Sequence, residues 1–373
     1  MKQQSNGHFE TSKPGRPARS LLLSLLLLLS LLRLGAEGCK LLNYADLFIG
    51  GGKLLIYSDL DSVDLKKEGS EISIVTDISQ AKDDNTLVKL NDGATVVYHG
   101  HTYELNRDLA TVLLLGIDHS VTDEAVPGEG GQSDVILLVA LDTESGTTKV
   151  LNISREANAQ VDVYSADNNW IETRFEQITL AYAYGNGRDT SCENTVRAVS
   201  RLLYGLPIGS YLSVDMAGIR KANELVGGVQ VPSLIDIRLP DGTTVREGDQ
   251  IELHGDNLER YIRYRDEELH ANARRMERQK QYITAFSKLF RDKTLENTAF
   301  PSELFSAMSS DVVTNLELSD IAFLSSTYLR HGTDFKLLTL DGSFDRYHGS
   351  TIFNVDESSL LETVLEIFYR QVD

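Results

Sequence analysis

Three apolar runs between residues 111 and 154 constrain the fold more than any other feature of the chain. TVLLLGID (111–118) and VILLVALD (135–142) are almost uninterrupted, which predicts strands buried on both faces. TTKVLNIS (147–154) follows after TESG, a turn sequence short enough to join the second and third runs in a hairpin. A sheet buried on both faces needs a layer of helices on each side.

Helical and strand patterns alternate along the rest of the chain. RFEQITLAYAYG and CENTVRAVSRLLYG predict two helices that end at Gly185 and Gly205, where a left-handed residue would cap each helix. Further segments predict the strands SYLSVD, VQVPS and FKLLTLDG, a hairpin around LPDGTT, and the helices MAGIRKANELVGG, SELFSAMS, LSDIAFLSSTYL and ESSLLETVLEIFYRQ. We therefore expect an α/β protein, a three-layer α/β/α sandwich with a mixed central sheet, over residues 108–373.

Residues 41–107 have a different pattern. The segments EISIVTDIS, TLVKL, ATVVYHG and HTYEL alternate between apolar and polar residues and are separated by turn sequences. This pattern predicts a small β-rich accessory region ahead of the main domain.

The first 40 residues predict export or anchoring. Lys2, Lys13, Arg16 and Arg19 precede a leucine run from Leu21 to Leu32, and Arg33 follows it. We expect residues 1–40 to form a cytoplasmic basic segment and an uncleaved membrane anchor, with the body on the extracytoplasmic face. Lipid modification at Cys39 is a lesser alternative, because Glu37 is a poor residue just before such a cleavage site.

Charge excludes nucleic acid as the partner. The first 40 residues carry six Lys/Arg and two Glu, a net +4, which leaves −23 on the remainder of a chain whose formal charge is −19. Such a surface repels a phosphate backbone, although a local basic pocket is still possible.

One predicted helix, from Arg275 to Phe290, places polar side chains on its apolar face. Tyr282, Ile283, Phe286, Leu289 and Phe290 recur at three- and four-residue steps, and Arg275 and Gln279 continue this stripe, whereas Gln281 falls on the opposite face. A buried guanidinium needs an anion, so the helix predicts a carboxylate or phosphate partner.

Three more arginines point to the same kind of ligand. Arg263 and Arg265 alternate in YIRYRDEE like neighbours on one face of an extended segment, and Arg155 follows the apolar strand VLNIS. In an acidic chain, these side chains together with Arg275 predict a pocket for a multiply charged anion.

Two carboxylates lie where they could hold a cation in that pocket. Asp118 ends the first apolar run, and Asp134 opens the second after a glycine-rich acidic loop. If the two strands are neighbours, both carboxylates could bind Mg²⁺ together with phosphate oxygens; alternatively, Asp118 only caps a turn. Cys192 predicts a small buried residue at a helix start, with a catalytic thiol as the less favoured reading.

The ordered series LLLGID, QSD, ILLVALD, ISRE, ITLAYAYG, LLYGLPIGSYLSVD, ELVGGVQV and RYR followed by R-xx-RQ resembles the LytR-CpsA-Psr family of envelope phosphotransferases. The resemblance covers roughly residues 109–290. It implies a polyprenyl-pyrophosphate lipid held in an apolar tunnel, and magnesium-dependent transfer of a glycopolymer phosphate to a peptidoglycan hydroxyl. It also implies teichoic acid or capsule attachment and cell wall biogenesis as the setting.

The resemblance assigns roles to residues of this sequence. Asp118 and Asp134 match the metal positions, Asp118, Arg155, Arg263 and Arg265 the catalytic ones, and Gln132, Arg275 and Gln279 the pyrophosphate-binding ones. Three positions depart from the family pattern: Gln132 replaces an arginine, Glu156 replaces an aspartate, and Asn272 replaces an aspartate that could act as a base. Glu267, Glu268 and His270 are candidate substitutes for that base. The alternative function is a non-catalytic envelope protein that binds the lipid or the polymer, and hydrolysis of the pyrophosphate is a third possibility.

Overall fold

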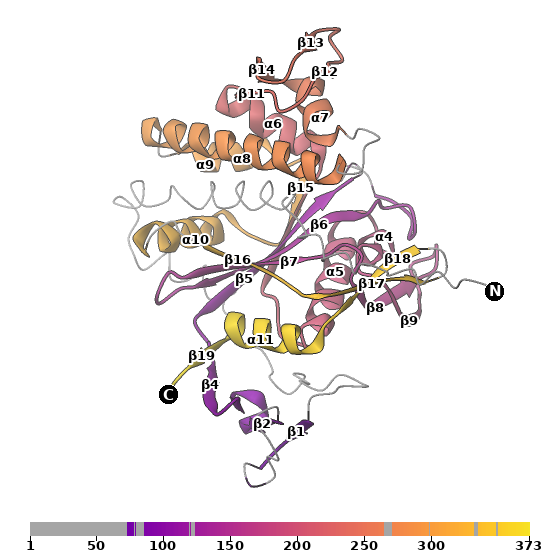
Figure 1. Cartoon of the computed structure of the whole chain (residues 1–373), viewed down its shortest axis with the longest axis vertical. Helices are drawn as coiled ribbons and strands as arrows, with labels where there is room; N and C mark the ends of the chain where they lie inside the picture. The colour runs from indigo at the N-terminus through magenta and orange to yellow at the C-terminus, as the bar shows by residue number, and fades with distance from the viewer. Residues whose placement is uncertain are drawn as a thin grey trace, which may run out of the picture.

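The computed structural model describes residues 73–77, 79, 86–118, 120, 124–264, 271–297, 299–331, 335–347 and 350–373. The predicted anchor (21–32) and Cys39 lie outside these residues. Among the helices described, none combines the length and the apolar character needed to span a membrane. Figure 1 shows the chain with its elements labelled.

A six-stranded mixed sheet forms the centre of the molecule. Its order is β15 (Val312–Thr314), β10 (Ser210–Val214), β5 (Leu109–Ile117), β6 (Ser133–Asp142), β7 (Thr148–Ile153) and β16 (Phe335–Thr339). β5, β6 and β7 are successive antiparallel neighbours, whereas β10 and β16 run parallel to β5 and β7. The predicted hairpin of the second and third apolar runs is therefore confirmed.

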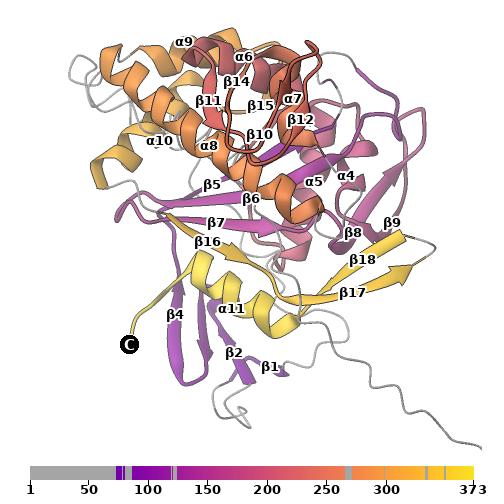
Figure 2. The same ribbon diagram turned by 45° about the horizontal axis from the view of Figure 1, so that its top comes forward.

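Five helices cover one face of this sheet. They are α6 (Met216–Val226), α7 (Gly255–Arg263), α8 (Ala271–Glu296), α9 (Phe300–Ala307) and α10 (Leu318–His331). α8 runs across this layer in Figures 1 and 2, and its buried Tyr282, Phe286 and Phe290 share a core with Leu114 and Leu137 of the sheet. The inward face of the predicted helix is thus confirmed at these aromatic positions.

Small strand pairs complete this layer beside α6 and α7. β11 (Val229–Pro232) pairs with β14 (Gln250–Leu253), and β12 (Ile237–Arg238) pairs with β13 (Thr244–Val245). α6 ends as predicted, because Gly227 adopts the left-handed conformation with φ of 98°.

The opposite face packs against α4 (Leu180–Ala183), α5 (Asp189–Leu202) and α11 (Glu357–Phe368). Leu113, Leu115 and Leu138 of the sheet share a second core with Val199 and Val364 of these helices. The two cores on opposite faces confirm the three-layer α/β/α sandwich.

A second sheet joins the beginning and the end of the described chain. β1 (Ser73–Val75), β2 (Thr86–Leu90), β3 (Thr95–Tyr98) and β4 (His101–Leu105), with the 3₁₀ turn η4 (Asn91–Gly93), form four strands, and β19 (Tyr369–Gln371) adds the fifth by pairing with β4. The predicted last helix therefore ends at Phe368 rather than continuing to Gln371. The boundary predicted between residues 107 and 108 stays a prediction.

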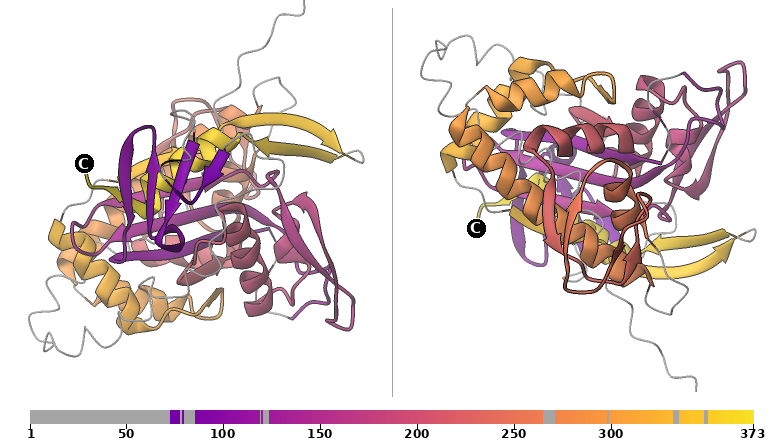
Figure 3. Two further views of the ribbon diagram at one scale, coloured as in Figure 1. Left: turned by 90° about the horizontal axis from the view of Figure 1, so that it is seen from below. Right: turned by 90° about the horizontal axis from the view of Figure 1, so that it is seen from above.

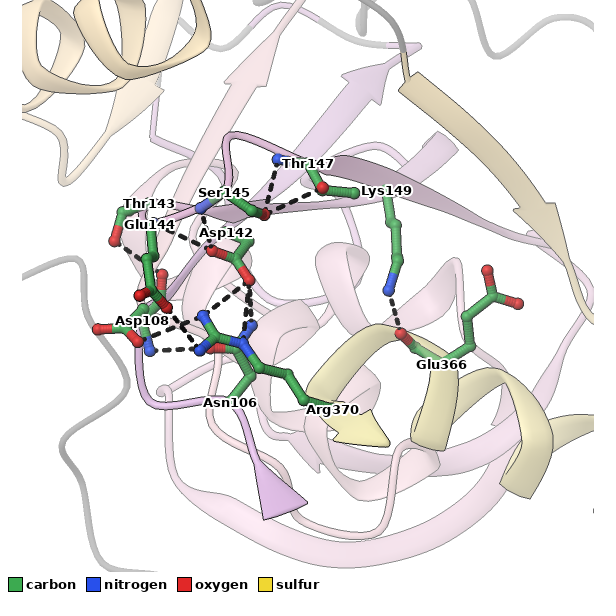
Figure 4. Close-up of polar contacts among 10 residues, drawn as sticks. All are labelled: Asn106, Asp108, Asp142, Thr143, Glu144, Ser145, Thr147, Lys149, Glu366 and Arg370. Atoms are coloured by element: carbon green, nitrogen blue, oxygen red, sulfur yellow. Dashed lines mark hydrogen bonds and ion pairs between the residues drawn. The ribbon is translucent and has the colours of Figure 1, made fainter. Parts of the chain in front are cut away.

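Figure 4 shows how β19 is fastened to the central sheet. Arg370 forms ion pairs with Asp108 at 3.3 Å, Asp142 at 2.9 Å and Glu144 at 2.7 Å. Nearby, Nζ of Lys149 donates to the main-chain oxygen of Glu366 in α11. These contacts tie the C-terminal residues to the strand ends of β5 and β6.

The helix predicted over RFEQITLAYAYG is wrong. Its first half belongs to strand β9 (Trp170–Gln177), which pairs with β8 (Asn158–Tyr164), and only α4 is helical. The four residues RFEQ are too few for their pattern to distinguish a strand from a helix, and pairing with β8 decides between them.

The predicted left-handed cap at Gly185 is also wrong. Gly185 does not have a positive φ. A Cβ placed on it would collide with the backbone of Ser191. Close approach of the two chain segments, not a helix cap, explains this glycine.

The hairpin formed by residues 342–355 was not predicted either. β17 (Gly342–Tyr347) pairs with β18 (Ser350–Val355), and β18 lies beside β8, where the amide of Phe353 donates to the carbonyl of Glu156 at 2.7 Å. The β8–β9 and β17–β18 hairpins project from the same side of the molecule in Figure 3.

Candidate functional site

The two predicted metal carboxylates lie on neighbouring strands. Ile117 pairs with Ser133 and Gly116 pairs with Val135, so Asp134 is the extra residue of a β-bulge in β6. Asp118 directly follows β5, and its amide donates to the carbonyl of Gln132 at 3.2 Å. The condition for a shared cation, that the strands are neighbours, is met.

Gln132 links Asp118 to the adjacent strand. The amide N–H of Gln132 donates to Oδ1 of Asp118 at 2.7 Å, so the two residues exchange main-chain and side-chain bonds. This bond orients the Asp118 carboxylate at the strand end. Turn geometry and a part in ligand binding are both compatible with it.

Arg155 is the centre of the predicted cluster. It leaves the end of β7, and its Nη2 donates to Oε1 of Gln132 at 2.5 Å while its Nη1 pairs with Asp134. Nε lies 3.7 Å from Oε1 of Glu156. The side chains of Arg155 and Asp134 remain 33% and 43% exposed, so an incoming ligand has access to both.

A buried threonine behind the cluster was not predicted. The amide of Thr179 donates to the carbonyl of Arg155 at 3.2 Å, and its Oγ1 donates to the carbonyl of Ser133 at 2.9 Å. Thr179 thus fixes the backbone of β7 relative to the start of β6. A lone threonine in ITLAYAYG gives no sequence signal for this role.

The loop between Asp118 and Gln132 rests on the α4–α5 connection. Ala125 donates to the carbonyl of Asn186 at 2.8 Å, and Gly128 donates to that of Ala183 at 2.7 Å. A Cβ at Gly130 would lie 3.0 Å from the backbone of Gly187, so close packing of two glycines holds the loop there.

Arg263 is placed differently from the prediction. It is the last residue of helix α7 rather than part of an extended segment, and its Nη1 pairs with Oε1 of Glu259 at 2.7 Å. Glu259 also pairs with Arg220 of α6. The helical pattern was missed because the apolar residues Leu258, Tyr261 and Ile262 were not recognised as one helix face. Arg265 lies outside the described residues, as do Glu267, Glu268 and His270.

Arg275 and Gln279 lie within α8, as predicted, but their side chains, like that of Asn272, are outside the described part of the chain. The assignment of Arg275 and Gln279 to the pyrophosphate therefore remains a prediction.

Arg278, one turn before Tyr282, is a buried arginine of α8 that was not predicted. It is fully buried, and its Nε donates to the carbonyl of Tyr261 at 2.9 Å while its Nη2 donates to that of Tyr264. The guanidinium lies 5.8 Å and 5.7 Å from the ring centroids of Tyr261 and Tyr264. It therefore caps the carbonyl groups at the end of α7, a structural role.

Gln281, predicted on the solvated face, is only partly exposed. Its Nε2 donates to the carbonyl of Pro232 at 2.7 Å, and its Oε1 accepts from the hydroxyl of Tyr261 at 2.9 Å. Packing of α8 against β11 and α7 covers this position, because these elements flank the apolar stripe on both sides.

Glu156 and Cys192 have structural contacts. Oε2 of Glu156 accepts from the hydroxyl of Ser154 at 2.9 Å. Cys192 is completely buried, and burial raises the pKa of its thiol to about 12 despite a hydrogen bond with Ser213. A thiol with so high a pKa is unsuited to nucleophilic catalysis, which agrees with the favoured prediction of a buried structural residue.

Asp118 and Asp134 fit a magnesium ion by their chemistry. Mg²⁺ in proteins is commonly held by one or two carboxylates, with substrate oxygens and water completing its coordination. Within the described residues, no group of three or more His, Cys, Asp or Glu side chains is placed to hold a metal. The two carboxylates therefore suit a cation that a phosphorylated ligand helps to bind.

Comparison with known sequences decides the family. The sequence profile of the LytR_cpsA_psr family matches residues 71–367, which is most of the chain. The chain belongs to the LytR_cpsA_psr family. The match begins ahead of β1 and ends within α11, so it includes both the central sheet and most of the second sheet.

Two proteins similar in sequence to this chain are named as teichoic acid transferases. The chain is 28% identical over 274 residues to the polyisoprenyl-teichoic acid–peptidoglycan teichoic acid transferase TagV of Bacillus subtilis, over 70% of this chain and 64% of that protein. It is 24% identical over 311 residues to the transferase TagU of Oceanobacillus iheyensis, over 82% of this chain and 83% of that protein. The chain thus spans somewhat less than two thirds of TagV.

Solved structures of this family share the fold. The crystal structure of Bacillus subtilis TagV matches with a TM-score of 0.51 and 25% identity, over 69% of this chain and 95% of that chain. Protein gbs0355 of Streptococcus agalactiae matches with a TM-score of 0.54 and 21% identity, over 70% of this chain and 86% of that chain. At 21% identity, the match to gbs0355 indicates a shared fold and nothing more.

Proposed function

We propose that this LytR_cpsA_psr protein is a membrane-tethered, magnesium-dependent phosphotransferase. Its reaction moves a glycopolymer phosphate from a polyprenyl-pyrophosphate lipid to a hydroxyl group of peptidoglycan. The observation that carries the proposal is the position of Arg155, whose guanidinium contacts Gln132 and Asp134 next to the Asp118 carboxylate. The names of TagV and TagU support the choice of reaction.

The ion pair between Arg155 and Asp134 is compatible with ligand binding. Both side chains are at least a third exposed, and ion pairs of this kind contribute only about 0–1 kcal/mol. A pyrophosphate offers the guanidinium charge-assisted, bidentate hydrogen bonds, so it can take the place of Asp134 as the partner of Arg155. The released Asp134 carboxylate then becomes available to a cation.

The chain's own groups act mainly by holding charge in place. Magnesium bound by Asp118 and Asp134 would neutralise charge on the pyrophosphate. Arg155, with Arg263, Arg265 and Arg275 as proposed partners, binds phosphate oxygens and orients the reacting phosphorus. Gln132 and Thr179 keep Arg155 in position. Phosphoryl transfer depends largely on such positioning and charge stabilisation.

The reaction transfers a substituted phosphoryl group from a pyrophosphate to a hydroxyl oxygen. The acceptor oxygen attacks the phosphorus that carries the glycopolymer, and a new P–O bond forms. The bond from that phosphorus to the bridging oxygen breaks, and the polyprenyl phosphate leaves. The proton of the acceptor hydroxyl passes to a base, for which Glu267, Glu268 and His270 are the candidates because Asn272 is not basic.

The membrane tether is proposed from the leucine run between Leu21 and Leu32 and its basic flank. A tether places the arginine cluster near a lipid-linked donor and raises its effective concentration. A lipid attached to Cys39 would hold the protein at the membrane in the same way.

Reconstituted transfer tests the proposal. The full chain in detergent is supplied with a polyprenyl-pyrophosphate-linked glycopolymer, peptidoglycan fragments and Mg²⁺, and the products are separated by mass. We expect polymer linked to peptidoglycan with the wild type, a loss of at least 100-fold with Arg155→Ala, and normal transfer with Arg238→Ala, a control at the exposed position of strand β12. Equal transfer by wild type and Arg155→Ala would refute the proposal.

One observation favours a second function. Gln132 supplies no positive charge where the family has an arginine, and Arg155 already has an acidic partner. A non-catalytic protein that binds the lipid or the polymer would need less charge stabilisation than an enzyme. Tight binding of the donor without turnover, unchanged in Gln132→Arg and Asn272→Asp, would establish this alternative; release of free polymer without an acceptor would instead indicate hydrolysis.

A further inference from the structure

The β8–β9 hairpin carries a group of exposed apolar side chains on its edge strand. Trp170, Ile171 and Phe175 are 60%, 54% and 49% exposed, whereas the large apolar residues of the central sheet, such as Leu113, Leu114 and Leu138, are buried. Soluble proteins seldom expose such side chains together without a binding role. We define these three residues as the hairpin patch.

The strand register places Trp170 and Phe175 of the patch on one face. Phe175 lies opposite Gln160 and Trp170 lies opposite Tyr164, and both partners belong to the same alternating set of β8. The register shifts next to Tyr164, which leaves Ile171 as the extra residue beside Trp170. Residues opposite each other in an antiparallel pair lie on the same face, so Trp170 and Phe175 share a face with Gln160.

The hairpin starts and ends at the candidate site. β8 begins three residues after Arg155, and the residues after β9 return to it, since Ile178 donates to the carbonyl of Ala157 and Thr179 to that of Arg155. The patch therefore forms a path from the arginine cluster toward the hairpin tip, with Phe175 nearest to the cluster. A substrate that enters the site from this side passes over the patch.

The hairpin is fixed rather than loosely attached. Asp162 of β8 is buried and receives hydrogen bonds from Arg201 at 2.8 and 3.1 Å and from Thr173 at 2.5 Å, while Arg197 donates to the hydroxyl of Tyr164 at 3.1 Å. Burial alone would raise the pKa of Asp162, but these bonds outweigh it and lower the pKa. The patch is thus presented by a rigid support, which limits the entropy lost on binding.

Charge argues against the anionic polymer and against a membrane as occupants. Residues 158–177 contain four carboxylates, Asp162, Asp167, Glu172 and Glu176, and one arginine, Arg174, a net −3. Arg197 and Arg201, which bind Asp162, bring the sum only to −1. A polyphosphate chain and an anionic lipid surface would both be repelled here.

The exposed area of the hairpin patch is too small for a stable interface with a second protein molecule. Aromatic side chains bury about 150–250 Å² each, so the exposed parts of the patch amount to on the order of 350 Å². A stable interface needs roughly 800 Å² from each partner. The patch is suited to a narrow ligand.

We infer that the hairpin patch binds the glycan strand of the peptidoglycan acceptor, with sugar rings stacked on Trp170 and Phe175. The negative face of an aromatic ring attracts the weakly positive C–H groups of a sugar face. Gln160, the exposed residue opposite Phe175, supplies an amide group to which sugar hydroxyl groups can bond. This inference rests on the proposed function, because it identifies where that reaction's acceptor lies.

Trp170 is the only tryptophan of the chain, so its fluorescence reports directly on the patch. The full chain in detergent is titrated with soluble peptidoglycan glycan strands from which the stem peptides have been removed. We expect a saturable change of tryptophan emission, an affinity at least fivefold lower for Phe175→Ser and Ile171→Ser, and an unchanged affinity for Leu318→Ser. Leu318 is a matched control because it is 52% exposed at the start of α10, far from the hairpin in Figure 1.

The same variants are then compared in the transfer assay. We expect Phe175→Ser to raise the KM for the acceptor at least fivefold while donor binding stays unchanged. Emission that does not respond to glycan would overturn the inference, even if the wild type transfers polymer normally. So would emission that responds only to anionic liposomes, or a dimer in solution that Phe175→Ser dissociates. A saturable glycan response without any transfer would support the patch but refute the proposed function, so the two failures are distinguishable.

Discussion

Nη2 of Arg155 donates a hydrogen bond to Oε1 of Gln132 at 2.5 Å. Gln132 also binds Oδ1 of Asp118 through its amide N–H at 2.7 Å. Gln132 therefore connects the arginine that follows β7 with the carboxylate that follows β5. Its side chain carries no charge, but it supplies an acceptor that orients the guanidinium of Arg155.

Replacing the Gln132 side chain should weaken the reaction without unfolding the protein. Gln132→Met keeps the length of the side chain and the main-chain bond to Asp118 but removes the acceptor for Arg155. A hydrogen bond to a charged group contributes about 1.5–3 kcal/mol, so we expect transfer to fall by roughly 10- to 100-fold. The measurement is kcat/KM for the donor together with the melting temperature. An unchanged kcat/KM would show that Gln132 does not position Arg155.

Arg278 should be essential for stability and not for chemistry. Arg278→Met keeps much of the buried volume but leaves the carbonyl groups of Tyr261 and Tyr264 without their donors. We expect the free energy of unfolding to fall by about 3 kcal/mol, measured by urea denaturation. Lys288→Ala, at an exposed position of the same helix, is the control and should change it by less than about 0.5 kcal/mol. A loss equal to that of the control would contradict the capping role.

Gly185 should tolerate no side chain. A Cβ at this position would collide with the backbone of Ser191, so Gly185→Ala must displace the start of α5. We expect a loss of about 3 kcal/mol or more, as for other strained substitutions in packed regions. Gly100→Ala is a useful comparison, because Gly100 has φ of 76° but nothing near its Cβ position, and it should cost only about 1 kcal/mol. Similar melting temperatures for both variants would show that contact with Ser191 is not limiting.

The Asp142 carboxylate should make stability depend on acid pH. Burial tends to raise its pKa, but the amide of Ser145, the side chain of Asn106 and the Arg370 guanidinium outweigh burial and hold the pKa below its ordinary value. A carboxyl group with a lower pKa in the folded state stabilises the fold above its unfolded pKa of about 3.9, and this contribution disappears as pH falls through the folded pKa.

Asp142→Asn should therefore lower the melting temperature at pH 7, and the difference from the wild type should shrink as the pH is taken below about 4. The cause is the set of bonds that Asp142 accepts from Ser145, Asn106 and Arg370, which Figure 4 shows. Glu247→Gln, at an exposed position away from Asp142, serves as the control and should leave the pH profile unchanged. A difference that stays constant from pH 7 to pH 3 would refute this account.

The central sheet could be predicted because its signals are long. The apolar runs that became β5, β6 and β7 exceed what a turn or an amphipathic helix contains, so their type and their burial on both faces follow from composition alone. β9 could not be predicted with equal certainty. Its residues run directly into a segment that contains the short helix α4, and only the partner strand β8 reveals the strand.

The candidate site was predicted in part, for a physical reason. Asp118, Asp134 and Arg155 stand at strand ends, and the strand order of a buried sheet brings such ends together. Arg263 is the end of a helix, and helix α7 has too few apolar residues for its pattern to be seen against a polar sequence. Thr179 acts through two backbone carbonyl groups, which leaves no trace in the sequence.

Direct binding of a pyrophosphate tests the central claim most closely. Isothermal titration of the full chain with a soluble isoprenyl pyrophosphate in the presence of Mg²⁺ compares the wild type with Arg155→Ala and with the control Arg238→Ala. We predict that Arg155→Ala raises the Kd at least tenfold and that Arg238→Ala leaves it unchanged. Equal Kd values for all three proteins would contradict the claim that the groups around Arg155 form a pyrophosphate site.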